Sequence, residues 1–130
     1  MAGSFSDYLE DKLLKHAFTN TTYTPAATMY VGLYTAAPTD AGGGTQVSGG
    51  SYARTSVTFT VSGTSTLCTN SAAVEFTAAT ASWGTIVAVG VFDASTAGNL
   101  LAWADLATNK TIDTGDIFRI PAGDLDITLS

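Results

Sequence analysis

Charged side chains are scarce in this sequence. Asp, Glu, Lys and Arg make up 12% of its 130 residues, about half the usual share. Thr, Ser, Ala and Gly take their place, and the net charge is −6. A surface so poor in charge is weakly protected against association, so the composition favours a chain that works packed against neighbours. The alternative is a monomer whose Thr content reflects β-structure alone.

Basic residues are especially few, and they form no cluster or stripe. Binding the phosphate backbone needs gathered Lys and Arg, so we expect no nucleic-acid partner. No apolar run approaches the roughly 20 residues of a membrane-spanning helix, and the first residues lack the basic and apolar regions of a signal peptide. We therefore expect no membrane partner and synthesis in a cytoplasm. The basic residues are Lys12, Lys15, Arg54, Lys110 and Arg119.

Histidine and cysteine occur once each, as His16 and Cys68. One cysteine cannot form an internal disulfide, and one histidine with one cysteine does not make a zinc site. The i−4 and i+4 neighbours of His16, Lys12 and Asn20, offer no carboxylate that could orient it for catalysis. A position near a helix C-terminus suits histidine through the helix dipole. We expect no catalytic residues, no cofactor and no metal site.

Acidic residues gather in the last third of the chain. Their carboxylates are of the type that calcium prefers, but no loop shows the spaced ligand pattern of calcium loops. Aspartate is also a frequent turn residue, and we interpret these residues as turn formers and solvated strand positions. They are Asp93, Asp105, Asp113, Asp116, Asp124 and Asp126.

One helix is predicted over residues 4–18, with Ser4 as its N-cap. Apolar side chains recur there at i+4 and form one stripe. The stripe packs either on the protein's own sheet or on a neighbouring subunit, and a terminal helix followed by a polar linker suits both arrangements. It consists of Phe5, Leu9, Leu13 and Ala17, with Tyr8 and Leu14 beside them.

The remaining sequence has the alternation of β-strands. Residues 28–35 and 83–92 carry apolar side chains on both faces, which predicts two central strands. Residues 52–61 alternate between an apolar and a polar face, as one strand does. The Gly-rich segment 36–50 lacks the Gly-Lys-Ser/Thr ending of a phosphate loop and is predicted as a contact loop.

About eight short strands separated by turns indicate a two-layer β fold. We predict a mainly β chain: an antiparallel β-sandwich or jelly-roll-like domain preceded by one N-terminal α-helix. The expected organisation is a single domain over residues 1–130, with the helix and linker in 1–22 and the sandwich in 23–130.

Six segments carry a pattern that runs over nearly the whole chain. They are residues 6–14 (SDYLEDKLL), 29–38 (MYVGLYTAAP), 49–54 (GGSYAR), 70–76 (NSAAVEF), 89–93 (VGVFD) and 98–101 (GNLL). With these segments in this order, the chain resembles a family of small structural proteins of tailed bacteriophages, often labelled tail fibre or minor structural proteins. The resemblance implies a virion component without enzyme activity, assembled in the bacterial host cytoplasm.

The resemblance leaves the position in the virion open. Since the chain has neither heptads nor repeats from which to build a fibre shaft, we predict a capsid decoration or cement protein that stabilises the head through surface contacts. A tail, tail-tip or fibre-associated adaptor is the alternative. A carbohydrate-binding module, with Trp83 or Trp103 stacking on sugar, is a further one, although tryptophan is more often a core anchor.

The expected partners are other copies of the chain, as a trimer or dimer, and the major capsid protein or tail proteins. Sheet edges and symmetric patches are the usual means of such contacts. We place the candidate interface on the helix and the Gly-rich loop. Its residues are Phe5, Tyr8, Leu9, Leu13, Asp40, Gly42, Gly43 and Gly44.

Overall fold

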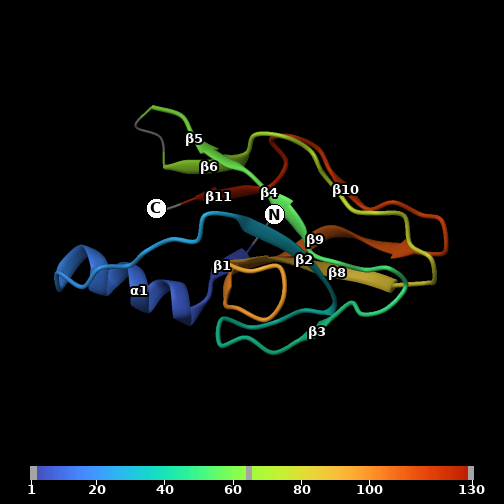
Figure 1. The fold of residues 1–130 in the computed structure, drawn as a ribbon, viewed down its shortest axis with the longest axis horizontal. Helices are drawn as coiled ribbons and strands as arrows, with labels where there is room; N and C mark the ends of the chain where they lie inside the picture. The colour runs from blue at the N-terminus through green and yellow to red at the C-terminus, as the bar shows by residue number, and fades with distance from the viewer. Residues whose placement is uncertain (1–2, 64–65, 129–130) are drawn as a thin grey trace.

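The computed structural model describes residues 3–63 and 66–128. These residues form antiparallel sheets of six, three and two strands, and helix α1 (Asp7–Phe18) extends from one end (Figure 1). The sheets lie in a sandwich-like arrangement and do not close into a barrel. The predicted mainly β sandwich with one N-terminal helix is therefore confirmed.

The largest sheet forms one layer. Its spatial order is β1-β9-β8-β2, and both β3 and β4 pair with the far edge of β2. All of its pairings are antiparallel. The strands are β1 (Gly3–Phe5), β2 (Met29–Ala36), β3 (Thr45–Gln46), β4 (Thr55–Val57), β8 (Gly84–Phe92) and β9 (Leu100–Ile112).

Strands β2 and β8 lie at the centre of this sheet, as their apolar faces predicted. Val31 and Leu33 of β2 are 0% exposed and face the second layer. Tyr34 and Ala88 are buried on the opposite face of the sheet. Burial on both faces explains why these two segments have almost no polar side chains.

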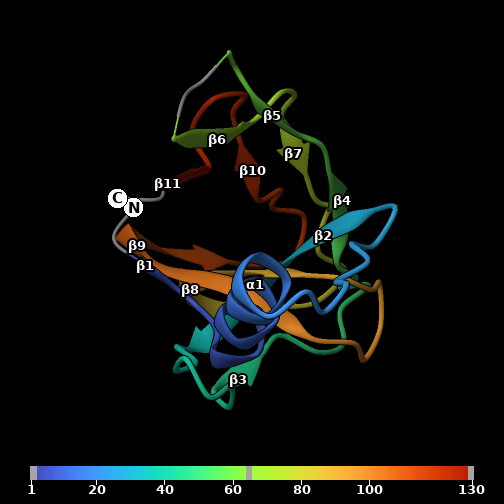
Figure 2. The ribbon, with the colours of Figure 1, turned by 90° about the vertical axis from the view of Figure 1, so that its left-hand side faces the viewer.

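Two smaller sheets form the second layer, which covers one face of the large sheet (Figure 2). One has the order β5-β6-β11, and the other pairs β7 with β10. The hydrophobic core lies between the layers. The five strands are β5 (Phe59–Val61), β6 (Leu67–Asn70), β7 (Val74–Glu75), β10 (Arg119–Ile120) and β11 (Asp126–Thr128).

Phe76 is at the centre of an aromatic cluster in this core. Its ring meets Trp83 edge-on, with centroids 6.3 Å apart, and Phe118 at 5.8 Å. Edge-to-face pairs at such distances add to the stabilisation from burial. Val74, from strand β7, and Phe76 are both buried in this core.

The opposite face of the large sheet carries a stacked cluster of different character. The ring of Phe92 lies where a Cβ on Gly32 or Gly90 would stand, at 2.8 and 3.1 Å. Arg54 stacks on this ring with its guanidinium carbon 3.5 Å from the centroid. Its Nη1 donates hydrogen bonds to the carbonyl oxygens of Ala94 and Ala97. This cluster thus ties the β8–β9 connection to the sheet.

Two predicted elements have different bounds in the structure. The helix begins at Asp7, and its N-cap is Ser6 instead of Ser4. Residues before it form strand β1, because they pair with β9 in the register Phe5↔Ala102. The predicted helix stripe therefore loses Phe5, which lies in the sheet.

The predicted strand 52–61 is two strands in different layers. Strand β4 pairs with β2, and β5 pairs with β6. The chain passes from one layer to the other at Thr58, between them. Val57 consequently points into the core, whereas Val61 is 55% exposed. The segment 36–50 also contains β3 and a bridge between Thr39 and Gly42.

Candidate functional site

Helix α1 is fixed to the sandwich through its first turn. The backbone N–H of Ser6 donates to the carbonyl of Leu101, and that of Asp7 donates to the carbonyl of Asp40, both at 2.8 Å. The hydroxyl of Ser6, which is buried, accepts a hydrogen bond from the N–H of Leu9 at 3.1 Å. The N-terminal amides that a helix leaves unpaired are thereby partly satisfied.

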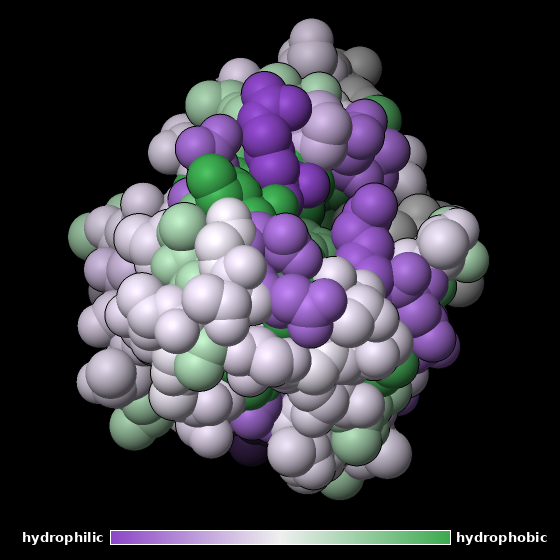
Figure 3. Space-filling model, turned by 90° about the vertical axis from the view of Figure 1, so that its right-hand side faces the viewer, coloured by the Kyte–Doolittle hydropathy of each residue, from purple (hydrophilic) through white to green (hydrophobic). Residues whose placement is uncertain are grey.

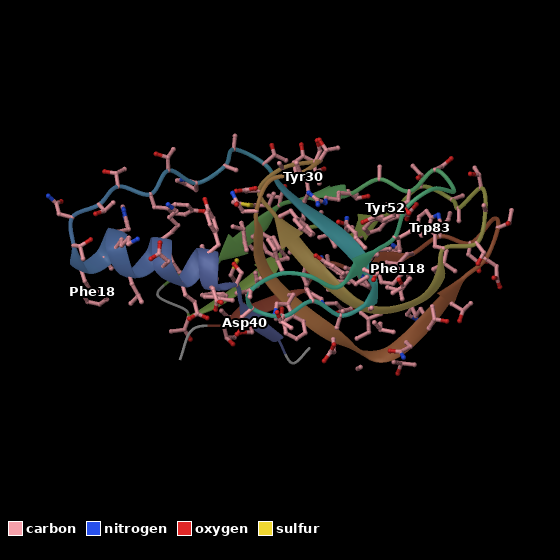
Figure 4. All side chains as sticks on the ribbon, turned by 90° about the horizontal axis from the view of Figure 1, so that it is seen from below. Phe18, Tyr30, Asp40, Tyr52, Trp83 and Phe118 are labelled. Carbon is pink, nitrogen blue, oxygen red and sulfur yellow. The ribbon has the colours of Figure 1, made fainter. Side chains whose placement is uncertain are left out.

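The rest of the helix extends away from the sheets and has no buried residue. Leu14 is 59% exposed and Phe18 is 81% exposed. They are four positions apart in the sequence, so they are neighbours on one face of the helix. Figure 4 shows Phe18 at the end of α1 that is farthest from the sandwich. Leu14, Lys15 and Phe18 together are called the helix tip below.

The segment 19–28 returns along the helix to β2. Nδ1 of His16 accepts a hydrogen bond from the backbone N–H of Tyr23 at 3.1 Å. Lys12 lies over the ring of Tyr8 at 5.5 Å. The His16 hydrogen bond attaches the returning segment to the helix, so His16 has a structural role, whereas the contact between Lys12 and Tyr8 lies within the helix. The predicted interface residue Leu13 is half-buried on the helix.

Three carboxylates gather at the base of the helix. One oxygen from each of Asp7, Glu10 and Asp40 lies within 4.8 Å of the others. Asp40 also accepts a hydrogen bond from Nε1 of Trp103 at 2.9 Å. Carboxylate oxygens are ligands that calcium and magnesium prefer, and exposed acidic groups also gather without a cation. The cluster makes the helix base negative, while the last turn carries Lys15 and His16.

An apolar groove opens between the two layers beside the helix base. Its volume is about 340 Å³. It lies between the large sheet and the β5-β6-β11 sheet, and Leu9 of the helix forms part of its wall. Burial raises the pKa of the Cys68 thiol, which disfavours the reactive thiolate. The wall includes Phe5, Leu9, Met29, Phe59, Val61 and Cys68.

The Gly-rich loop lies against the helix base through Asp40. Thr39 and Gly42 exchange two backbone hydrogen bonds of 2.8 Å, which close the loop tightly. Gly42, Gly43 and Gly44 have φ of 100°, 79° and 73°, a region that favours glycine. At Gly44 a Cβ would also stand 2.7 Å from the carbonyl oxygen of Ala36. These glycines therefore shape the loop.

The structure brings several predicted interface residues together at one end of the molecule. Phe5 and Leu9 line the groove, and Asp40 belongs to the acidic cluster. Their role as an interface remains a prediction. The predicted interface left out Leu14, which flanks the predicted stripe, and Phe18, although their i+4 spacing was a visible signal.

The other predicted chemical groups have structural partners. Trp83 is buried, and its Nε1 donates to the carbonyl of Gly50 at 2.9 Å, so it offers no platform for a sugar. Asp93 accepts from the backbone N–H of Asn99, and Asp116 accepts from that of Asp113. These aspartates close turns, as aspartate commonly does.

The end of the molecule opposite α1 differs from the helix end. There, polar side chains surround small apolar spots (Figure 3). Ile117 is 52% exposed.

Across the described residues, no helix has the length and apolar character needed to cross a membrane.

The structure is a β-sandwich with a projecting helix and an apolar groove beside the helix base. Both features suit a structural protein that binds other protein surfaces. The comparison with protein families agrees with this description. Residues 4–128 match the family described as Podophage GP4 fiber I protein gp80. The chain belongs to this family, which confirms the resemblance to phage structural proteins. No curated protein matches the chain.

Membership makes the chain a phage fibre protein and thus a structural component of the virion. Fibre proteins of this kind are typically non-enzymatic, and they associate with other tail or fibre proteins. The match favours the fibre-associated alternative over the predicted capsid decoration protein. The absence of heptads had argued against a fibre shaft, but a fibre also contains parts other than its shaft.

Proposed function

We propose that this chain is a fibre-associated adaptor, which joins fibre or tail subunits by surface contact and catalyses no reaction. The observation that carries the proposal is the projecting helix, whose tip exposes Leu14 and Phe18. Single exposed apolar residues are common on proteins. Here two of them are adjacent on an element that buries none of its residues.

The length of the helix supports the same proposal. An isolated helix of about 12 residues is marginal in water, because most helical stability comes from packing an apolar face. Helix α1 has 12 residues and packs mainly through its first turn and the returning segment. Contact with a partner would bury the tip and stabilise the last turns. The helix therefore suits a docking role better than a role in the core.

The chemistry of the described residues supports a role without catalysis. His16, the one histidine, accepts a backbone hydrogen bond, and Cys68 has a raised thiol pKa. The hydrogen bond occupies Nδ1 of His16, and the raised pKa disfavours the Cys68 thiolate that would act as a nucleophile. The family is likewise one of structural fibre proteins.

Labelling of intact virions tests the proposed position. Antibodies against this chain, attached to gold particles, are expected to decorate the tail fibres in electron micrographs. An antibody against the major capsid protein provides the control label on the head. Gold from this chain distributed over the head shell would contradict the proposal and restore the decoration role.

A further inference from the structure

We propose that the helix tip binds the apolar groove of a second copy of this chain. This inference names a binding partner for the helix tip, and it rests on the proposed adaptor function. It follows from three properties of the chain: the size of the groove, the charges around it, and the distance between the groove and the tip.

The size of the groove matches the two apolar side chains of the tip. An engineered cavity of roughly 150 Å³ accommodates one benzene molecule. The groove has about 340 Å³, which is space for Leu14 and the ring of Phe18 together. Since the two residues are i,i+4 neighbours, one helix face can insert both. An aromatic residue also contributes a large apolar area to an interface.

Charge favours a second copy as the occupant. Leu9 of the groove wall is followed by Glu10, which belongs to the acidic cluster of Asp7, Glu10 and Asp40 at the helix base. The tip presents its apolar pair together with Lys15. Lys15 already pairs with Asp11 at 2.9 Å.

That ion pair leaves Lys15 able to change partners. The side chains of Lys15 and Asp11 are 53% and 49% exposed. Ion pairs exposed to this degree contribute little to the free energy of folding. Lys15 can therefore turn toward the acidic cluster beside the groove of a neighbouring copy. A partner for this groove needs apolar side chains beside a positive charge, and the helix tip has both.

The tip cannot enter the groove of its own chain. Leu9 lines the groove, and Phe18 lies nine residues further along the helix, which at 1.5 Å per residue is about 14 Å away. The contact must therefore join different copies. Because tip and groove are different surfaces, the contact is heterologous, and it closes into a ring or continues as a row of copies.

Two variants of the full chain test this contact by light scattering after size-exclusion chromatography. Phe18→Asp disables the tip and Val61→Asp disables the groove, and both positions are exposed, so both variants should fold. Wild type is expected to associate as its concentration rises. Each variant alone is expected to lose this association and to elute at the monomer mass of 13.3 kDa.

Mixing the variants is the decisive step. Phe18→Asp retains an intact groove and Val61→Asp retains an intact tip, so the mixture is expected to form a one-to-one pair. The control Ile117→Asp changes an equally exposed apolar residue outside the groove lining and should associate like wild type. Circular dichroism checks that every variant is folded.

Several results would overturn the inference. Wild type that remains monomeric at high concentration, a Phe18→Asp variant that still associates, or a mixture that forms no pair would each do so. The gold label on virions is independent of these results, so the adaptor function can stand while the inference fails.

Alkylation of Cys68 provides a second measurement if Val61→Asp fails to fold. This cysteine lines the groove and is the only one in the chain. Its alkylation is expected to slow as wild-type concentration rises, and to be independent of concentration in Phe18→Asp. Equal rates in the two proteins at every concentration would overturn the inference.

Discussion

The sandwich and the projecting helix differ in how far they bury their apolar side chains. In the sandwich, Phe76 is 2% exposed and packs on aromatic neighbours, and the polar residue Asn70 is 1% exposed with all its hydrogen bonds made. In the helix, no residue is buried, and Phe18 is 81% exposed. Apolar side chains are therefore buried in the core of the sandwich and exposed along the helix.

This difference indicates that stability depends on the buried core, whereas contact depends on exposed apolar residues such as those of the helix tip. Substitutions in the buried core of the sandwich should lower the free energy of unfolding. Substitutions at the helix tip should leave that free energy nearly unchanged and weaken association. The following predictions test the separation, beginning with the largest effect expected.

Replacing the central core ring should destabilise the protein most. Phe76→Ala removes the ring that contacts Trp83 and Phe118 and leaves a cavity, so the free energy of unfolding should fall by about 3–5 kcal/mol. Denaturant titration measures this change. A loss below about 1 kcal/mol would show that the core can collapse around the missing ring.

Replacing the buried amide should have the next largest effect. Asn70 donates to the carbonyls of Ala72 and Pro121 and accepts from the N–H of Leu125, each at 2.9 Å. Asn70→Leu leaves buried backbone groups without partners, so unfolding free energy should fall by about 2–3 kcal/mol. The neighbouring, exposed Ser71→Ala is the control. Similar losses in both variants would contradict the assigned role of Asn70.

Arg54 should contribute less, because its surroundings are partly open. Arg54→Met removes the stacking on Phe92 and the hydrogen bonds to Ala94 and Ala97, with an expected loss of about 1–2 kcal/mol. Arg54→Lys keeps the charge but lacks the planar fork, and should lose nearly as much. Full stability in the lysine variant would mean that charge alone is required.

Alkaline pH should weaken the sandwich through Tyr52. Burial raises the pKa of this phenol above its ordinary value of 10.0. The folded state therefore retains the proton more strongly than the unfolded state, and stability should fall as the pH rises above about 10. Thermal melting from pH 8 to 11 measures the fall. In Tyr52→Phe, stability should fall less steeply with pH. An unchanged slope would show that Tyr52 does not cause the fall.

The smallest effect on stability is expected at the helix tip. Leu14→Ala combined with Phe18→Ala changes two exposed residues, and the free energy of unfolding should shift by less than about 0.5 kcal/mol. The same denaturant titration used for Phe76→Ala makes the comparison direct. A loss above 1 kcal/mol would mean that the tip packs on its own chain in solution.

The sequence predicted the parts of the fold in which local pattern and burial agree. Strands β2 and β8 were found because both of their faces are apolar. The predicted helix start was wrong because Phe5 fits the apolar stripe of a helix as well as it fits a strand. Only its pairing with Ala102 shows that it belongs to a strand. The split at Thr58 was missed for a similar reason, since alternation continues while the strand changes sheets.

The candidate site was predictable only in part. Leu9 lay on the predicted stripe, whereas Phe18 lay off it and was not considered. The acidic cluster joins Asp7 and Glu10 with Asp40, about 30 residues away in the sequence. A contact of that kind depends on how the loop folds against the helix base, which the alternation of residues does not reveal.

Hydrogen exchange measured on the free chain and on the chain assembled in virions tests the separation of stability and contact most directly. Assembly is predicted to slow exchange strongly in residues 7–18 and to leave the central strands β2 and β8 unchanged, because the helix gains a partner whereas these strands are already buried. If residues 7–18 exchange at the same rate in both states while other segments become protected, the helix is not the contact element.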